Sequence, residues 1–156
     1  VLAELVLQHS GSDANPGLFQ RLGEGLDLLE AEADQELIPL LLALLWSLVG
    51  ELGYGPVFES CVECGRELGG EEMARFDFAA GGLRCPDCHA GSQGPRIGPG
   101  ARAQLSDLIQ GHVPQELNRL RAHLRLASDF VTYHISGGMP LRSMEVLYSL
   151  IPASHA

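Results

Sequence analysis

The fold is decided by two short stretches of sequence, Cys61-Val62-Glu63-Cys64 and Cys85-Pro86-Asp87-Cys88. Each is a Cys-x2-Cys turn, a spacing that lets two sulfurs reach one ion without straining the backbone. Two such turns complete the tetrahedron that Zn²⁺ accepts at about 2.3 Å per sulfur. Four thiolates leave no open position for water or substrate. The pattern therefore predicts a structural zinc site and not a catalytic one.

Two other uses of these cysteines are considered. Two disulfides would suit a secreted chain, but the stretch Val1–Leu5 is short, is interrupted by Glu4 and does not resemble a secretory signal. Iron is harder to exclude, because Cys64-Gly65 and Cys85-Pro86 also resemble rubredoxin, where the same thiolates hold a redox iron. Rubredoxins, however, lack long helical segments. His89 follows Cys88, but four thiolates already saturate zinc, so we expect His89 to be a bystander.

The residues between the two cysteine turns predict a small β element. Residues 75–79 alternate between polar and apolar side chains, and Gly81-Gly82 then precedes Leu83-Arg84. Alternation followed by a glycine pair is typical of a short hairpin. We expect a zinc ribbon whose hairpin leads into the second cysteine turn.

Helical patterns flank the ribbon on both sides. The first covers residues 1–9, and Asn15-Pro16 supplies a capping residue with proline at the first position of the next. A third helix is expected from about Leu37 to Leu52, with Trp46 in the interior, and its apolar run is too short to span a bilayer. Further helices are expected over residues 102–110, from Pro114 to about Ile135, and over residues 141–150, with Gly137-Gly138 ending the longest.

These elements predict a mainly α protein, a helical bundle with an inserted small β zinc ribbon. We divide it into a first helical part (1–56), the ribbon (57–90), a Gly/Pro-rich linker (91–100) and a second helical part (101–156). Paired carboxylates, a Ser/His/Asp set and an HExxH motif are not found, so we expect no enzymatic activity.

Charge is distributed unevenly along the chain. Residues 1–89 hold 4 arginines and 16 acidic residues, whereas residues 90–156 hold 6 arginines and 4 acidic residues. The acidic part should repel a phosphate backbone, so an anionic partner is expected to meet the C-terminal third. Charge and helical spacing single out four arginines there as candidate partner-binding residues, with an ordinary solvated helix face as the alternative: Arg119, Arg121, Arg125 and Arg142.

Several motifs in order resemble one protein family. They are Asn15–Phe19, the stretch from Leu52 through the first cysteine turn to Arg66, the stretch from Ala80 to Cys88, and His134–Ser143. Together they are similar to the helical and zinc-binding region of the bacterial DNA-repair family RecO. The resemblance covers nearly the whole chain and is far more specific than a zinc ribbon alone.

The resemblance implies a non-enzymatic recombination mediator of the RecF pathway. Members of the family dock the C-terminal tail of the single-stranded DNA-binding protein, work with RecR, help to load the recombinase and anneal strands. They begin with an oligonucleotide-binding (OB-fold) β-barrel that is absent here, so we expect a C-terminal fragment whose main DNA contacts lie elsewhere. We expect a cytoplasmic protein with no membrane partner and a structural Zn²⁺. The alternatives are a zinc-ribbon adaptor unrelated to repair and a rubredoxin-like electron-transfer module.

Overall fold

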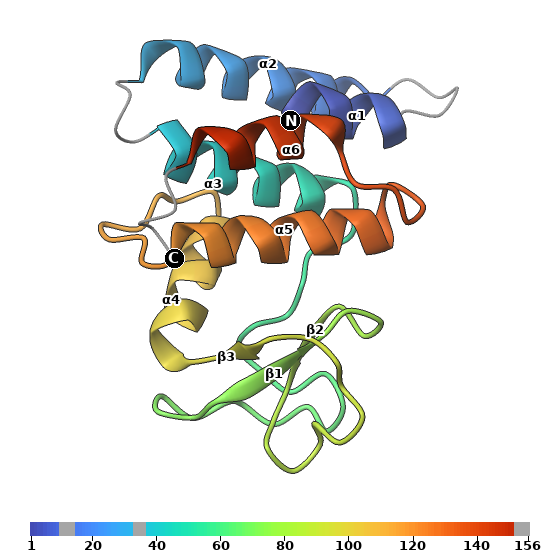
Figure 1. Ribbon diagram of the computed structural model, residues 1–156, viewed down its shortest axis with the longest axis vertical. Helices are drawn as coiled ribbons and strands as arrows, with labels where there is room; N and C mark the ends of the chain where they lie inside the picture. Colours follow the sequence, from blue (N-terminus) through green and yellow to red (C-terminus); the bar gives the residue numbers. More distant parts are fainter. Residues whose placement is uncertain (10–14, 33–36, 152–156) are drawn as a thin grey trace.

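The computed structural model describes residues 1–9, 15–32 and 37–151. In these ranges the chain forms six helices and a small three-stranded sheet, with the strands lying between α3 and α4 in the sequence, which confirms the predicted fold class (Figure 1). The elements in chain order are α1 (Leu2–His9), α2 (Pro16–Ala31), α3 (Leu37–Glu51), β1 (Ala74–Asp77), β2 (Gly82–Arg84), β3 (Arg96–Ile97), α4 (Pro99–Ile109), α5 (Leu120–His134) and α6 (Arg142–Leu150).

Helix α3 is the centre of the helical part. It packs against α1, α2, α4 and α5, so most of its circumference is buried. This burial explains why the segment is apolar almost throughout instead of carrying a single apolar stripe. In Figure 1, α1 and α2 lie at one end of the molecule and the ribbon lies at the other, with α3, α5 and α6 between them. No helix of the described residues is long and apolar enough to cross a bilayer.

An aromatic cluster joins the ribbon to the helices. Trp46 of α3 is 0% exposed, as predicted for an interior residue, and its ring lies 5.3 Å from that of Phe130 in α5. On the ribbon side, the ring centroid of Phe58 lies 6.4 Å from that of Trp46, and the ring centroid of Phe76 in β1 lies 6.0 Å from that of Phe130. Ring pairs at these separations add about 0.5–1.5 kcal/mol each beyond the area they bury. The ribbon is therefore part of the main core and not a separate appendage.

The sheet has the strand order β2-β1-β3, and both pairings are antiparallel. The β1–β2 pair is the predicted hairpin, but the strand β3 lies inside the segment 91–100, which we expected to be an irregular linker. A close approach makes this strand feasible: a Cβ on Gly94 would lie 2.2 Å from the carbonyl oxygen of Phe76, so only glycine fits there. Helix α4 also begins within the segment, at Pro99. The division into domains itself stays a prediction.

The predicted cap of α2 and the predicted stop of α5 are correct, whereas the predicted starts of α4 and α5 are not. Asn15 caps α2 by accepting the N–H of Leu18 at 3.0 Å, and Gly138, with a φ of 87°, donates to Thr132 O after α5. The predicted start of α5 at Pro114 is wrong, because the helix begins at Leu120. Arg119, just before it, has a φ of 53°, in the left-handed region that interrupts a right-handed helix.

Two polar contacts fix the ribbon against the helices. Arg102 of α4 is buried, and its guanidinium donates to the carbonyl oxygens of Gly69 and Glu72 in the ribbon. The His134 side chain at the end of α5 contacts Phe78 O through Nε2 at 2.7 Å. Because a carbonyl oxygen only accepts, Nε2 carries the proton in this contact.

A carboxylate on α1 caps the N-terminus of α6. The Glu4 side chain accepts the backbone N–H groups of Arg142 and Ser143, each at 2.9 Å, and also the Ser143 hydroxyl. These are N–H groups that a helix leaves without an intrahelical partner, and a negative charge at this end is favourable. The hydrogen bond from the Ser143 side chain, followed by those from the two backbone N–H groups, lowers the pKa of Glu4.

We predict that Glu4→Gln lowers the free energy of unfolding by about 0.5–1 kcal/mol at neutral pH, the usual cost of weakening an N-cap. A folded-state pKa below the unfolded value means that the Glu4 contribution is present at neutral pH and is lost as the pH falls through the lowered pKa. The difference between the two proteins should therefore shrink towards zero in acid. Urea unfolding at a series of pH values checks this, with Glu30→Gln on the exposed side of α2 as a control; a difference independent of pH would contradict it.

Candidate metal centre

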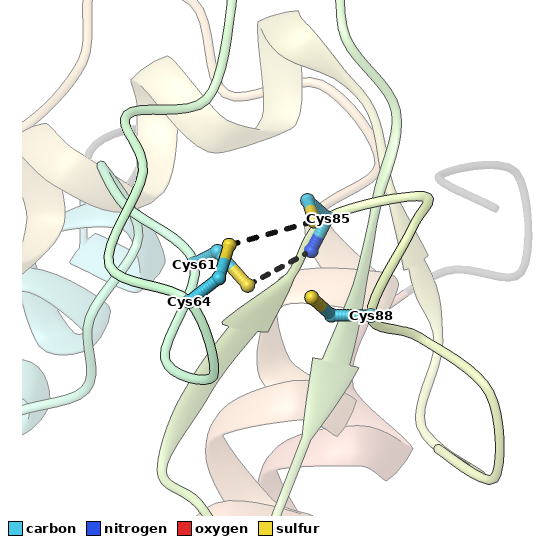
Figure 2. A group of neighbouring side chains, drawn as sticks. All are labelled: Cys61, Cys64, Cys85 and Cys88. Atoms are coloured by element: carbon cyan, nitrogen blue, oxygen red, sulfur yellow. Dashed lines mark hydrogen bonds between the residues drawn. The ribbon is translucent and has the colours of Figure 1, made fainter.

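The four cysteines come together at the tip of the ribbon. Cys61 and Cys64 lie in the turn that precedes β1, and Cys85 and Cys88 lie in the turn that follows β2. Figure 2 shows the two turns facing each other, with all four side chains directed towards one point. Their sulfur atoms all lie within 4.8 Å of one another. Tetrahedral sulfurs at the usual zinc distance are about 3.8 Å apart, so the four sulfurs are positioned to bind one metal ion.

Backbone hydrogen bonds close each of the two cysteine turns. The N–H of Gly65 donates to Cys61 O at 2.8 Å, and the φ of 74° at Gly65 allows the chain to reverse there. The second turn closes with Cys88 N–H donating to Cys85 O at 3.1 Å. Across the site, Cys85 N–H donates to the sulfur of Cys61 at 3.4 Å (Figure 2). The protein itself therefore ties the two turns to each other, without a metal ion.

The thiols differ in how readily they lose a proton. Burial raises the pKa of the Cys61 thiol, but backbone N–H groups, first those of Cys64 and Cys85, donate to the sulfur and bring the pKa down to about 6. The hydrogen bond to Cys85, burial and the nearby sulfurs raise the pKa of Cys88 to about 12. Four thiolates this close repel one another, so a cation is needed to hold all four in the ligand form.

Charged side chains surround the two turns. Arg66 forms an ion pair with Glu72. Arg84 forms two ion pairs, from Nε to Asp77 Oδ2 at 2.8 Å and from Nη1 to Glu63 Oε2 at 2.9 Å. The Nδ1 of His89 lies 2.5 Å from Pro86 O and is occupied by that hydrogen bond. Among the described residues, the metal-binding group contains the four cysteines and not His89. This agrees with the expectation that His89 is a bystander.

Three of the four candidate arginines gather around one end of α5. Arg119 and Arg125 line a cavity of about 700 Å³, and Arg121 and Arg125 line a second one beside α6. The Arg121 guanidinium already donates to Ile151 O at 2.9 Å and to Tyr148 O, at the C-terminal end of α6. Because α6 runs antiparallel to α5, Arg142 at its start lies at the far end of this helix pair. The structure thus separates Arg142 from the others.

The larger cavity includes residues that the sequence did not single out. It lies between the ribbon and helices α4 and α5, and Arg96 of β3 is on its ribbon side. His123 on α5 is 4% exposed, and its Nε2 lies 3.0 Å from Gln104 Oε1. Burial lowers the pKa of His123 to about 4, so it is neutral at neutral pH. Only the pairing of β3 with β1 places Arg96 here, and its Gly/Pro-rich surroundings concealed that strand.

Comparisons with known proteins identify the family of this chain. A family model described as "Recombination protein O C terminal" matches residues 1–145. The chain belongs to this family. A protein of Maridesulfovibrio salexigens called "DNA repair protein RecO" is 30% identical over 79% of this chain and 52% of its own length. Proteins with the same name from Symbiobacterium thermophilum and Rubrobacter xylanophilus are 34% and 33% identical over 54% and 64% of this chain.

The matched region is only part of these RecO relatives. It covers 52% of the Maridesulfovibrio protein, 34% of the Symbiobacterium protein and 40% of the Rubrobacter protein. The chain therefore spans about half or less of the length of the curated relatives it matches. The family match covers the first three helices, the ribbon, α4 and α5, so it includes both the cysteine site and the larger cavity.

We predict that Cys61→Ser or Cys88→Ser abolishes metal binding, disorders the two cysteine turns and lowers the melting temperature, while most helical signal remains because the aromatic contacts of Phe58 and Phe76 do not involve the turns. Structural metal sites contribute apparent binding energies of about 10–16 kcal/mol in peptides, which is large beside the roughly 5–15 kcal/mol stability of a domain. Metal analysis, circular dichroism and the melting temperature check this. His89→Ala, which alters the second cysteine turn but no ligand, is the control and should retain the metal. Loss of all helical signal in the cysteine variants would contradict the prediction and would mean that the helices cannot fold without the ribbon.

Proposed function

We propose that this chain is the partner-docking part of a non-enzymatic mediator of DNA repair and recombination in the RecF pathway. In this proposal it docks the C-terminal tail of the single-stranded DNA-binding protein and cooperates with RecR, which helps recombinase loading and strand annealing. Most contact with DNA is made by the oligonucleotide-binding barrel of the whole protein. Membership of the RecO C-terminal family supports this role over an unrelated adaptor or a rubredoxin-like electron carrier.

The cavity between the ribbon and α4–α5 is the observation that carries the docking proposal. Its volume is about 700 Å³, in the range of clefts that hold a peptide side chain or a small ligand. Its lining is largely apolar and includes Met73, Phe78, Pro95, Ile97, Leu105 and Leu126. An aromatic side chain buried there would be removed from water on several sides.

The charged groups at this cavity suit a peptide C-terminus. Arg119 and Arg125 lie on its α5 side and Arg96 on its ribbon side, so arginines from two elements line one apolar hollow. A tail that ends in phenylalanine and carries acidic residues needs both parts, an apolar notch for the ring and guanidinium groups for the carboxylates. His123 is neutral and does not add to the charge. Asp129 also lines the cavity, and its Oδ2 lies 3.8 Å from Arg125 Nε. The positive charge of Arg125 is therefore partly compensated by this carboxylate.

The four candidate arginines enter this proposal unequally. Arg119 and Arg125 line the cavity, whereas Arg121 is directed to the end of α6 and would act mainly by holding that helix. Arg142 lies at the far end of α6, where we propose at most a contact with an extended partner. Arg119→Ala and Arg125→Ala are therefore the informative substitutions.

We further propose that the cysteine site holds structural zinc. Four thiolates in closed coordination suit Zn²⁺, which has no redox chemistry and needs no open position when its role is to support the fold. The four sulfurs within 4.8 Å of one another support this assignment. Elemental analysis of the purified protein tests it. One zinc ion in a colourless protein is expected, and a coloured protein containing iron with a reversible potential would overturn the assignment.

We predict that a labelled C-terminal peptide of the single-stranded DNA-binding protein binds this chain saturably in fluorescence anisotropy. Removal of the terminal phenylalanine should weaken binding about tenfold or more, because the buried ring contributes about 1.5–3 kcal/mol. Arg119→Ala and Arg125→Ala should each weaken binding, and added salt should weaken it further.

Two controls accompany this measurement. Arg21→Ala removes the same charge from α2, where Arg21 pairs with Glu51 at 2.9 Å, and should leave peptide binding unchanged. Ala122→Trp should fill the cavity from α5 and block the peptide without removing any charge. Equal binding of the peptides with and without phenylalanine, or no binding of either, would refute the docking proposal.

A further inference from the structure

A row of three arginines crosses the sheet of the ribbon. Arg75 of β1 is paired directly with Arg84 of β2 on one side and with Arg96 of β3 on the other. Residues directly opposite each other on neighbouring strands point to the same face of a sheet. Phe76 and Leu83, the next pair along β1 and β2, are buried and face the core. The three arginines therefore share the outer face.

Acidic side chains neutralise only one end of this row. Arg84 lies 2.8 Å from Asp77 and 2.9 Å from Glu63. Arg75 donates to the neutral carbonyl of Gly94 at 3.0 Å, and Arg96 is exposed. The ion pairs found among the described residues involve neither Arg75 nor Arg96. Like charges directly opposite each other in a sheet are unfavourable, so two adjacent guanidinium groups without a carboxylate need an explanation.

A cavity lies at the uncompensated end of the row. Arg75, Arg96 and His89 line a hollow of about 240 Å³ together with Met73, Ala74 and Pro86. No acidic side chain is among these lining residues, although residues 1–89 hold 16 acidic residues against 4 arginines. His89 donates its Nδ1–H to Pro86 O, which fixes the orientation of the ring at the edge of the hollow.

We propose that this hollow binds a phosphate group in the backbone of a nucleic acid strand. Arg75 and Arg96 are paired on neighbouring strands, whose backbones are about 5 Å apart, and their guanidinium groups present planar pairs of donors that match the oxygens of a phosphodiester. The lining has no deep apolar notch that would hold a peptide side chain; Met73 and Pro86 are its largest apolar residues. The exposed side of Arg96 leaves room for a polymer to continue past the site, which favours a phosphodiester within a strand.

This site adjoins the peptide cavity proposed above, and its assignment rests on Arg75, which lines only the smaller hollow. The two hollows share Met73 and Arg96, but Arg75 and His89 line only the smaller one and Arg119 lines only the larger one. The ribbon would thus add one contact to a strand that is held mainly by other parts of the whole protein. One contact in an acidic region gives weak binding with a strong dependence on salt.

The test uses the metal-loaded chain and a short fluorescein-labelled oligothymidylate in anisotropy titrations at low and moderate salt. The expected result is saturable, salt-sensitive binding that Arg75→Ala and Arg96→Ala each weaken about tenfold, the loss of one charge-assisted contact. Arg119→Ala should leave oligonucleotide binding intact, even where it weakens the peptide. Arg21→Ala on α2 is the matched control for net charge and should have no effect.

The two arginine variants distinguish damage to the fold from loss of a direct contact with the oligonucleotide. Arg75 also holds Gly94 O, so its substitution can loosen the 91–97 segment, whereas Arg96 is exposed and its substitution should leave the melting temperature and metal content unchanged. Weaker oligonucleotide binding in a fully folded Arg96→Ala protein supports the site. The proposal is overturned if the parent protein does not bind, if Arg21→Ala weakens binding as much as Arg96→Ala, or if Arg75→Ala, which removes a residue that lines only the smaller hollow, leaves oligonucleotide binding unchanged.

Discussion

The packing of Phe58 and Phe76 against Trp46 and Phe130 is the contact on which the rest of this structure depends. It is the place where the ribbon and the helical part bury their apolar surfaces against each other, and Trp46 is 0% exposed as a result. Without the ribbon, the large aromatic surfaces of α3 and α5 would face water. Without the helices, the inner face of a sheet whose strands are two to four residues long would have nothing to cover it.

This packing gives the metal centre a wider influence than its position suggests. The cysteines lie at the tip of the ribbon, but the strands that carry Phe76 and Leu83 lie between the two cysteine turns. A metal ion that fixes those turns therefore also fixes the register of the strands and the direction of their inward side chains. Arg102 of α4 and His134 of α5 also hold the ribbon in place, because their side chains donate hydrogen bonds to carbonyl oxygens of the ribbon. The cavity between the ribbon and α4–α5 and the smaller hollow beside Arg75 are both bounded by ribbon residues, so a metal ion bound by the cysteines would indirectly shape each of them.

The features that the sequence predicted well were those with a local cause. The spacing of the cysteines, the cap at Asn15, the apolar run around Trp46 and the glycine pair after α5 each depend on a few neighbouring residues, and each was confirmed. The errors came from contacts between distant residues. The left-handed backbone of Arg119 delays the start of α5, and no residue near it in the sequence indicates that conformation. Strand β3 forms because Gly94 lies against the backbone of Phe76, which is distant in the sequence. The grouping of the arginines was equally hidden, because Arg75 and Arg96 become neighbours only through strand pairing.

The cap that Glu4 provides for α6 also constrains the order of assembly. Its partners, Arg142 and Ser143, are separated from it by 138 and 139 positions in the chain. A ribosome releases the chain from its N-terminal side, so α1 emerges long before the helix that it caps. Until residue 143 has left the exit tunnel, α1 can pack on α2 and α3 but cannot make this contact. The joining of α1 to α6 is thus a late event of synthesis, when the first helix and the last helix of the described chain are brought together.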